Sequence, residues 1–224
     1  MEPKELFDKM EAALVDMDGT LLDTMQIWRQ CNIDYLDSNG IQMTPEQRLR
    51  IVCAASGNLL FEYVRETFGF EFDVPLFRDL QRKRMMEAYL GGSRIKPGAR
   101  EFLAALRRRG VKIVLSTSTW ATHATIALTK SGFVPFFDAI CCSDAVDASK
   151  SKPDYFEKVS ALIGVPVNRC VLFDDGFHAH KGARAAGLLG GVGVADATNV
   201  VFREELAGLT DFMVDSLEEL LPFI

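Results

Sequence analysis

The sequence predicts an α/β protein in which a doubly wound parallel sheet carries one helical insertion. Two observations lead to this fold class. Short apolar runs rich in β-branched residues alternate with amphipathic helical segments, and acidic pairs follow two of those runs. Apolar runs this short suit strands that are buried on both faces of a parallel sheet. The alternation of strand and helix supplies the crossover connections that parallel strands need.

Six runs are predicted to form the strands. In chain order they are Ala12–Val15, Val111–Leu115, Ala139–Cys142, Cys170–Phe173, Gly191–Ala195 and Phe212–Val214. The helices between them have clear start and stop signals. Pro97 precedes the helical pattern Ala99–Arg109, which Gly110 ends, and Pro153 opens a helix that stops at Gly164. Proline at a helix start and glycine just past its end are the usual arrangement.

The region from about residue 22 to residue 92 interrupts this alternation, since it holds no strand-like run of comparable strength. Four helices are predicted there: Met25–Ser38, Pro45–Ala55, Leu59–Phe68 and Pro75–Leu90. We therefore expect residues 1–21 and 93–224 to form one α/β core and residues 22–92 to form a helical insertion. The insertion follows the first strand directly.

Composition restricts the partners. Lys and Arg number 25 against 31 Asp and Glu, so the net charge is −6. An acidic chain is a poor binder of nucleic acid, and it needs a metal or local cations to handle phosphate. No apolar run approaches the ~18 residues of a membrane span, and the charged start MEPKELFDKM is unlike a secretory signal. The odd number of cysteines, 5, without metal-type pairs fits thiols in a reducing cytoplasm, where we expect the protein.

The strongest local signal is the string Asp16-Met17-Asp18-Gly19-Thr20, directly after the first apolar run. Two carboxylates two residues apart at a strand end repel each other unless a counter-charge is present. A hard divalent cation with oxygen ligands relieves this repulsion, and Mg²⁺ is the usual choice beside phosphate. Gly19 allows a sharp turn of the backbone there. A simple Asp-Gly turn is the alternative interpretation.

Three weaker signals follow later strands. Asp174 and Asp175 come after the fourth run, Lys152 precedes the helix opened by Pro153, and the segment 116–119 (Ser-Thr-Ser-Thr) follows the second run. A lysine offers an ammonium group to phosphate, and hydroxyls with backbone N–H groups form an anion cradle. All four signals lie at strand carboxyl ends, where open α/β sheets place their ligands. Together they predict a phosphate site.

In this order of motifs the sequence resembles the haloacid dehalogenase-like hydrolase superfamily over essentially its whole length. The string DMDGTLLDT, a later hydroxyl, a lysine before a helix and an acidic pair carry the resemblance. It implies a Rossmann-like core, and it implies that the insertion is a helical cap of the kind found in phosphoglycolate phosphatases and β-phosphoglucomutases.

The resemblance also implies a role for each matching residue. Asp16 is the expected nucleophile, and Asp18 is the expected general acid and base. The expected Mg²⁺ ligands are the Asp16 carboxylate, the Asp18 backbone carbonyl and Asp175, with Asp174 nearby or acting through water. The expected phosphate-binding groups are Thr117, Ser118 and Lys152. Ser116 is the alternative to Thr117, which is preferred because the apolar strand ends at Leu115.

Departures from the family pattern narrow the expected function. Asp18 favours phosphoryl transfer over dehalogenation, and Trp28 stands where sugar phosphomutases carry a histidine. His178 and His180 do not share a helix face, which favours a surface or helix-start role over a joint metal site. We therefore expect a Mg²⁺-dependent phosphatase of a small phosphorylated metabolite. A phosphomutase and a non-catalytic phosphate-binding protein are the alternatives. The sequence carries no signal for an oligomeric state.

Overall fold

The structure is a computed structural model that describes residues 1–53 and 58–224. Its centre is a six-stranded, fully parallel sheet in the order β3-β2-β1-β4-β5-β6. The strands are β1 (Ala12–Val15), β2 (Lys112–Thr117), β3 (Ala139–Cys142), β4 (Cys170–Asp174), β5 (Gly190–Val194) and β6 (Phe212–Val214). The predicted doubly wound parallel sheet is confirmed. The strand order reverses at β1, and open α/β sheets bind ligands at such a switch point.

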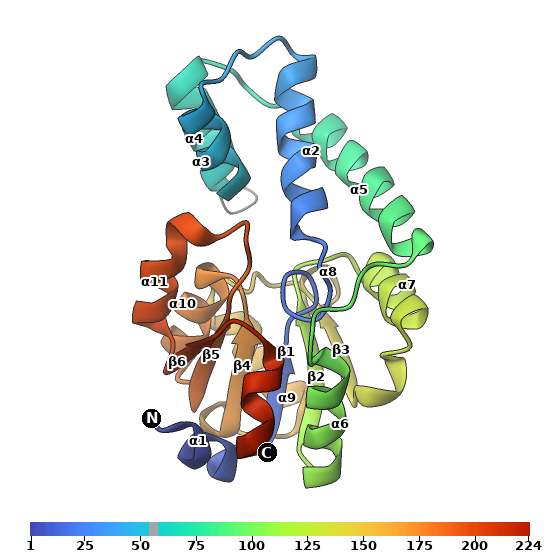
Figure 1. Ribbon diagram of the computed structural model, residues 1–224, viewed down its shortest axis with the longest axis vertical. Helices are drawn as coiled ribbons and strands as arrows, with labels where there is room; N and C mark the ends of the chain where they lie inside the picture. Colours follow the sequence, from blue (N-terminus) through green and yellow to red (C-terminus); the bar gives the residue numbers. More distant parts are fainter. Residues whose placement is uncertain (54–57) are drawn as a thin grey trace.

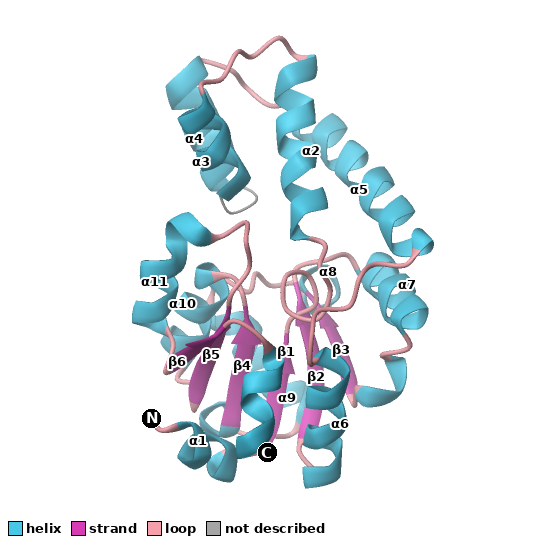
Figure 2. Cartoon of the chain, viewed as in Figure 1, coloured by secondary structure: helices cyan, strands magenta, loops and turns pink. Residues whose placement is uncertain are grey.

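Helices cover both faces of the sheet (Figures 1 and 2). They are α1 (Pro3–Lys9), α6 (Ala99–Arg109), α7 (Ala121–Ser131), α8 (Ser143–Val146), α9 (Pro153–Ile163), α10 (Phe177–Ala186) and α11 (Arg203–Leu209). Four short 3₁₀ segments complete the core: η1 (Val134–Phe136), η2 (Val167–Arg169), η3 (Val200–Phe202) and η4 (Leu217–Phe223). The N-terminal α1 had no strong sequence signal, yet its Leu6 and Phe7 are fully buried.

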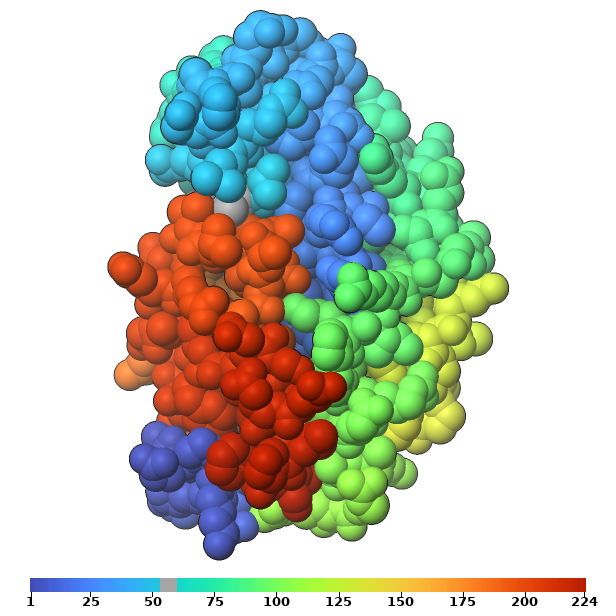
Figure 3. All heavy atoms as spheres, viewed as in Figure 1, coloured from blue at the N-terminus to red at the C-terminus, as the bar shows by residue number. Residues whose placement is uncertain are grey.

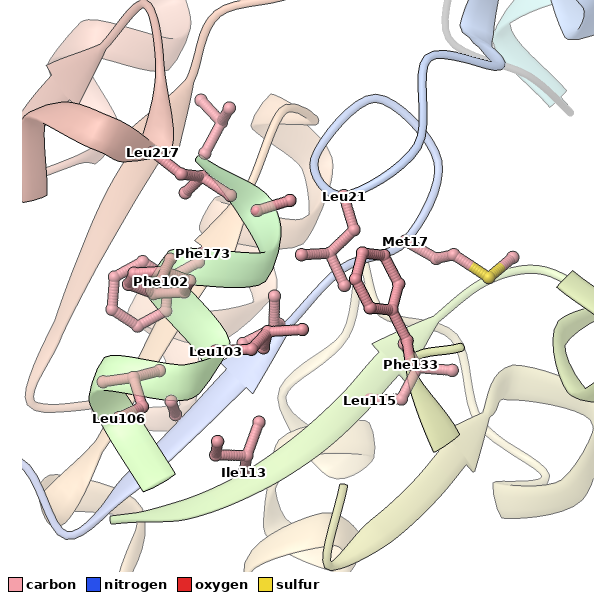
Figure 4. Packing of buried hydrophobic residues seen from close by; sticks show 14 of the residues in the cluster. Met17, Leu21, Phe102, Leu103, Leu106, Ile113, Leu115, Phe133, Phe173 and Leu217 are labelled. Atoms are coloured by element: carbon pink, nitrogen blue, oxygen red, sulfur yellow. The ribbon is translucent and has the colours of Figure 1, made fainter. Parts of the chain in front are cut away.

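Alternate residues of β1 belong to two separate apolar layers. Ala13 and Val15 pack into the layer under α1, α6, α7 and η4, whereas Ala12 and Leu14 pack into the layer under α9 and α10. This period of two explains why the strand is apolar throughout. Figure 4 shows the first layer, in which the rings of Phe102 and Phe173 lie 4.9 Å apart edge to face. Each such ring contributes about 1.5–3 kcal/mol by leaving water.

Between β1 and α6, the residues that the structure describes form four helices above the carboxyl ends of the strands (Figure 1). They are α2 (Met25–Ser38), α3 (Pro45–Cys53), α4 (Asn58–Phe68) and α5 (Val74–Gly91). The last residues of the predicted helix Pro45–Ala55 lie outside the described part. This helical layer has its own apolar cluster, in which Tyr35 stacks on Phe72 with ring centroids 5.2 Å apart. We call these four helices the cap, and its predicted limits, 22 and 92, stay a prediction.

The chain passes from core to cap at residues 21–23 and returns at residues 94–96, and these two segments lie side by side. The Asp23 amide donates to the Arg94 carbonyl at 2.8 Å, and the Lys96 amide donates to the Leu21 carbonyl at 2.9 Å. The cap also rests on the core where α5 packs on α7 and α3 meets η3. Figure 3 shows the second contact, where the blue-to-cyan part of the cap meets the orange segment. In the described part of the chain, every helix is too short or too polar to span a bilayer.

Candidate functional site

The ends of β1 and β4 bring three carboxylates together. Val15 pairs with Phe173, so the next residues, Asp16 and Asp174, lie in neighbouring positions at the sheet edge. The Asp16 amide donates to the Phe173 carbonyl at 2.9 Å, which fixes this register. One carboxylate oxygen from each of Asp16, Asp174 and Asp175 lies within 4.8 Å of the others, and all three residues are buried. The predicted gathering of acidic residues at this edge is therefore present.

The buried amine of Lys150 lies among these carboxylates. Its Nζ donates to Asp16 Oδ1 at 2.7 Å, to Asp174 Oδ2 at 2.5 Å and to the Ser116 carbonyl at 2.6 Å. Burial alone lowers the pKa of Lys150, but the charges of Asp16 and Asp174 outweigh it and raise that pKa well above its usual range. Lys150 is therefore a permanent ammonium group with three acceptors.

The Lys150 ammonium, with a weaker contribution from the Arg29 guanidinium to Asp175, does not offset the burial of these carboxylates. Burial raises the pKa of Asp16 from 3.8 to about 8, although the Lys150 charge opposes this, and the charge of Asp174 adds to the rise. Burial, Asp174 and Asp16 likewise raise the pKa of Asp175 well above its usual range. Further positive charge at this point would ionise both groups. An all-oxygen donor set with excess negative charge fits a hard divalent cation such as Mg²⁺.

Asp18 is held differently, by three hydroxyl groups. Its Oδ1 accepts from Thr24 Oγ1 at 2.5 Å and from the Tyr89 hydroxyl at 2.7 Å, while its Oδ2 accepts from Thr119 Oγ1 at 2.6 Å. Thr24 precedes the first cap helix and Tyr89 lies near the end of the last one, so both crossings into the cap contact this carboxylate. Since its side chain is engaged here, the carboxylate of Asp18 stands apart from the acidic cluster.

The hydroxyl segment after β2 also ends at this edge, and β2 continues two residues beyond the predicted strand. Ser116 donates its hydroxyl to the Tyr155 hydroxyl at 3.2 Å, on the α9 side of the sheet. Thr117 is the last strand residue, and its Oγ1 accepts from the Thr119 amide at 3.1 Å. Ser118 is exposed. The Ser116 hydroxyl is thus directed into the α9 layer, which leaves Thr117 and Ser118 as the candidate phosphate ligands.

The structure does not bring Lys152 into the site. Lys152 is the extended N-cap residue of α9 and is exposed, whereas Lys150 is only 5% exposed. The backbone of this loop packs against α10, where a Cβ on Gly182 would clash with the Lys150 carbonyl oxygen. This contact and the fixed helix start at Pro153 turn Lys150 inward and Lys152 outward. The predicted lysine is therefore displaced by two residues.

Asn199, which the sequence did not single out, and His180, which it did, complete the surroundings of the acidic cluster. Asn199 Nδ2 donates to the Asp175 carbonyl at 2.5 Å, and His180 Nε2 lies 3.0 Å from the Asp174 carbonyl. His180 is buried rather than on the surface, and burial lowers its pKa, so a neutral imidazole donates this hydrogen bond. The Asn199 contact joins residues 24 positions apart, which no local motif reveals, whereas His180 lies only 6 positions after Asp174.

A parallel sheet with a buried lysine and a buried carboxylate cluster at its switch point is typical of α/β enzymes that handle phosphate. Comparison with known families agrees. The family model described as haloacid dehalogenase-like hydrolase matches residues 10–187, and the chain belongs to this family. The predicted family and the prediction of a hydrolase enzyme are confirmed.

The sequence identity between this chain and individual relatives is low. The chain is 25% identical to the phosphorylated carbohydrates phosphatase of Thermotoga maritima, over 85% of this chain and 88% of that protein. It is 28% identical to SUPPRESSOR OF QUENCHING 1, chloroplastic, of Arabidopsis thaliana over 80% of its own length, but it spans only 17% of that protein. The phosphate complex of CbbY from Rhodobacter sphaeroides superimposes with a TM-score of 0.75 at 22% identity, over 94% and 96% of the two chains. That likeness shows the fold.

Proposed function

We propose that the protein is a Mg²⁺-dependent phosphatase that hydrolyses a small phosphorylated metabolite. The observation that carries this proposal is the contact of Asp16 with the Lys150 ammonium inside the acidic cluster. This contact supports the proposal, because an ammonium group beside the Asp16 carboxylate could bind the phosphoryl group that Asp16 would attack. The name of the Thermotoga relative, a phosphatase of phosphorylated carbohydrates, supports a sugar phosphate as the substrate class.

In this proposal Asp16 attacks phosphorus and forms an aspartyl-phosphate, while the leaving oxygen departs from the opposite side. Lys150, Thr117 and Ser118 hold phosphoryl oxygens and neutralise their charge. Asp16, Asp174, Asp175 and the Asp18 carbonyl would hold Mg²⁺, which supplies charge neutralisation between the carboxylate and the phosphate. A water molecule then cleaves the aspartyl-phosphate and releases inorganic phosphate.

Asp18 gives a proton to the leaving oxygen and later takes one from water in this scheme. The hydroxyls of Thr24, Thr119 and Tyr89 orient its carboxylate before substrate binds. Since two of these donors belong to the cap crossings, the arrangement of the cap contributes to the orientation of the acid. Hydrolysis requires that the cap admit water to the aspartyl-phosphate, whereas exclusion of water would favour transfer to a sugar.

Removal of divalent cations tests the proposal directly. We expect phosphate release from a panel of sugar phosphates and short phosphorylated acids with Mg²⁺, and loss of that release with EDTA, because the carboxylates then lack their counter-charge. Released phosphate is measured by colorimetry, and sugar phosphate isomers are followed in a coupled assay. Isomer formation without phosphate release would favour a phosphomutase. Absence of both reactions across the panel would support the non-catalytic alternative.

Tyr89→Phe tests the positioning of Asp18. The variant keeps the buried ring but removes one hydroxyl donor to a carboxylate, an interaction worth about 1.5–3 kcal/mol. We expect kcat for an alkyl phosphate to fall roughly ten- to a hundred-fold, with a smaller fall for an aryl phosphate whose leaving group needs no acid. Tyr63→Phe is the matched control, because Tyr63 packs in the cap against Phe68. Equal losses for both substrates would argue against a role through Asp18.

A further inference from the structure

Lys96 lies on the segment by which the chain returns from the cap, and its side chain is only 13% exposed. Its amine has three acceptors on two different loops. Nζ donates to the Gly19 carbonyl at 2.6 Å, to the Ala195 carbonyl at 2.9 Å and to Asp196 Oδ2 at 3.3 Å. None of these acceptors takes part in the chemistry proposed above. Lys96 therefore joins the loop after β1 to the loop after β5.

Both of these loops contact Asp175. Gly19 has a φ of +90°, and a Cβ built on it would lie 2.5 Å from Asp175 Oδ2, so the backbone at Gly19 forms one wall beside this carboxylate. Asn199 forms another contact, since its Nδ2 donates to the Asp175 carbonyl at 2.5 Å and lies 3.4 Å from Asp175 Oδ2. The position of Asp175 thus depends on how these two loops are held.

The turn formed by residues 196–199 is ordered by Asp196, the residue that also accepts from Lys96. Asp196 Oδ1 accepts from the Thr198 amide at 2.9 Å and from the Thr198 hydroxyl at 2.8 Å. The Asp196 amide donates to Asn199 Oδ1 at 3.3 Å, which orients the amide group whose nitrogen reaches Asp175. A continuous chain of hydrogen bonds therefore runs from the Lys96 ammonium through Asp196 and Asn199 to Asp175.

We propose that Lys96 is a positioning residue for Asp175, and that it sets the affinity of the acidic cluster for a divalent cation. This inference rests on the proposed function, because it takes Asp175 as a ligand of the cation. Partners that orient metal ligands typically change metal affinity by about 10–100-fold when they are removed. Lys96 also belongs to the segment that pairs with residues 21–23, so this residue connects the acidic cluster to the return of the chain from the cap.

The experiment measures Mg²⁺ binding by titration calorimetry on the whole protein without substrate. We expect Lys96→Met to weaken Mg²⁺ binding about 10–100-fold, and kcat at saturating Mg²⁺ to stay within a few-fold of the unsubstituted protein. Lys112→Met is the matched control, because the Lys112 amine also donates to a backbone carbonyl, that of Ile163, at the opposite end of β2. Its Mg²⁺ affinity should be unchanged.

A second variant distinguishes a specific effect on Mg²⁺ affinity from a general loss of stability. Asn199→Leu removes the donor to Asp175 and leaves the Lys96 amine in place, and it should weaken Mg²⁺ binding in the same direction. Lower thermal stability with unchanged Mg²⁺ affinity in both variants would overturn the inference and leave the phosphatase proposal intact. Failure of the unsubstituted protein to bind Mg²⁺ would instead overturn the proposed metal dependence, and this inference with it.

Discussion

Asp16→Asn is expected to reduce phosphate release by at least about 10³-fold at saturating Mg²⁺, because an amide oxygen does not form the aspartyl-phosphate. The side chain keeps its size, and Lys150 keeps its contacts with Asp174 and the Ser116 carbonyl. The loss should therefore lie in kcat, while the protein remains folded. Single-turnover and steady-state release of inorganic phosphate measure it. Asp8→Asn, an exposed position that pairs with Arg109, is the matched control.

The same variant should change the pH dependence of stability in the metal-free protein. The pKa of Asp16 is raised from 3.8 to about 8, mainly by burial, so the folded state holds a proton that the unfolded state has lost between about pH 4 and pH 8. The free energy of unfolding should fall as pH rises through that window. Asp16→Asn should lack this contribution in thermal unfolding. In the phosphate-release assay, a rate for Asp16→Asn equal to that of the unsubstituted protein would show that another residue is the nucleophile.

The strands were predictable from the sequence because each contains a short run of apolar residues. β1, β3 and β6 begin and end at the predicted residues. β2 extends to Thr117 because the buried Ser116 hydroxyl finds a partner in Tyr155, a contact between residues 39 positions apart. Polar residues inside a buried strand have no sequence pattern of their own, so the predicted second strand ends at Leu115, before the observed end of β2 at Thr117.

The carboxylates of the site were predictable for a similar reason. They lie at or just beyond the carboxyl ends of β1 and β4, and parallel strands bring these ends together at one edge of the sheet. The lysine was not predictable at single-residue precision, since Lys150 and Lys152 are two positions apart in one loop. The choice between them depends on the packing of this loop against Gly182 of α10, which no local motif reveals. Of the hydroxyls around Asp18, that of Thr24 belongs to the same motif, whereas those of Tyr89 and Thr119 come from distant segments and depend on the folded structure.

Lys150→Met and Lys152→Met are expected to separate these two lysines sharply. Lys150→Met removes the ammonium that bonds Asp16 and Asp174, so phosphate release should fall by about 10²–10³-fold. Loss of one partner of a buried ion pair also costs about 3–5 kcal/mol of stability, since the carboxylates lose their compensating charge. In the proposed site Mg²⁺ would supply positive charge to the same oxygens, so saturating Mg²⁺ should recover part of this stability.

Lys152→Met should change stability by less than about 0.5 kcal/mol, because the side chain is exposed at the start of α9. Its kcat and KM should match those of the unsubstituted protein. Thermal unfolding with and without Mg²⁺, together with initial rates of phosphate release, distinguishes the two variants. Full activity in Lys150→Met combined with a loss in Lys152→Met would return the phosphate-binding role to the residue first expected. The buried contacts of Lys150 with both Asp16 and Asp174 argue for the opposite result.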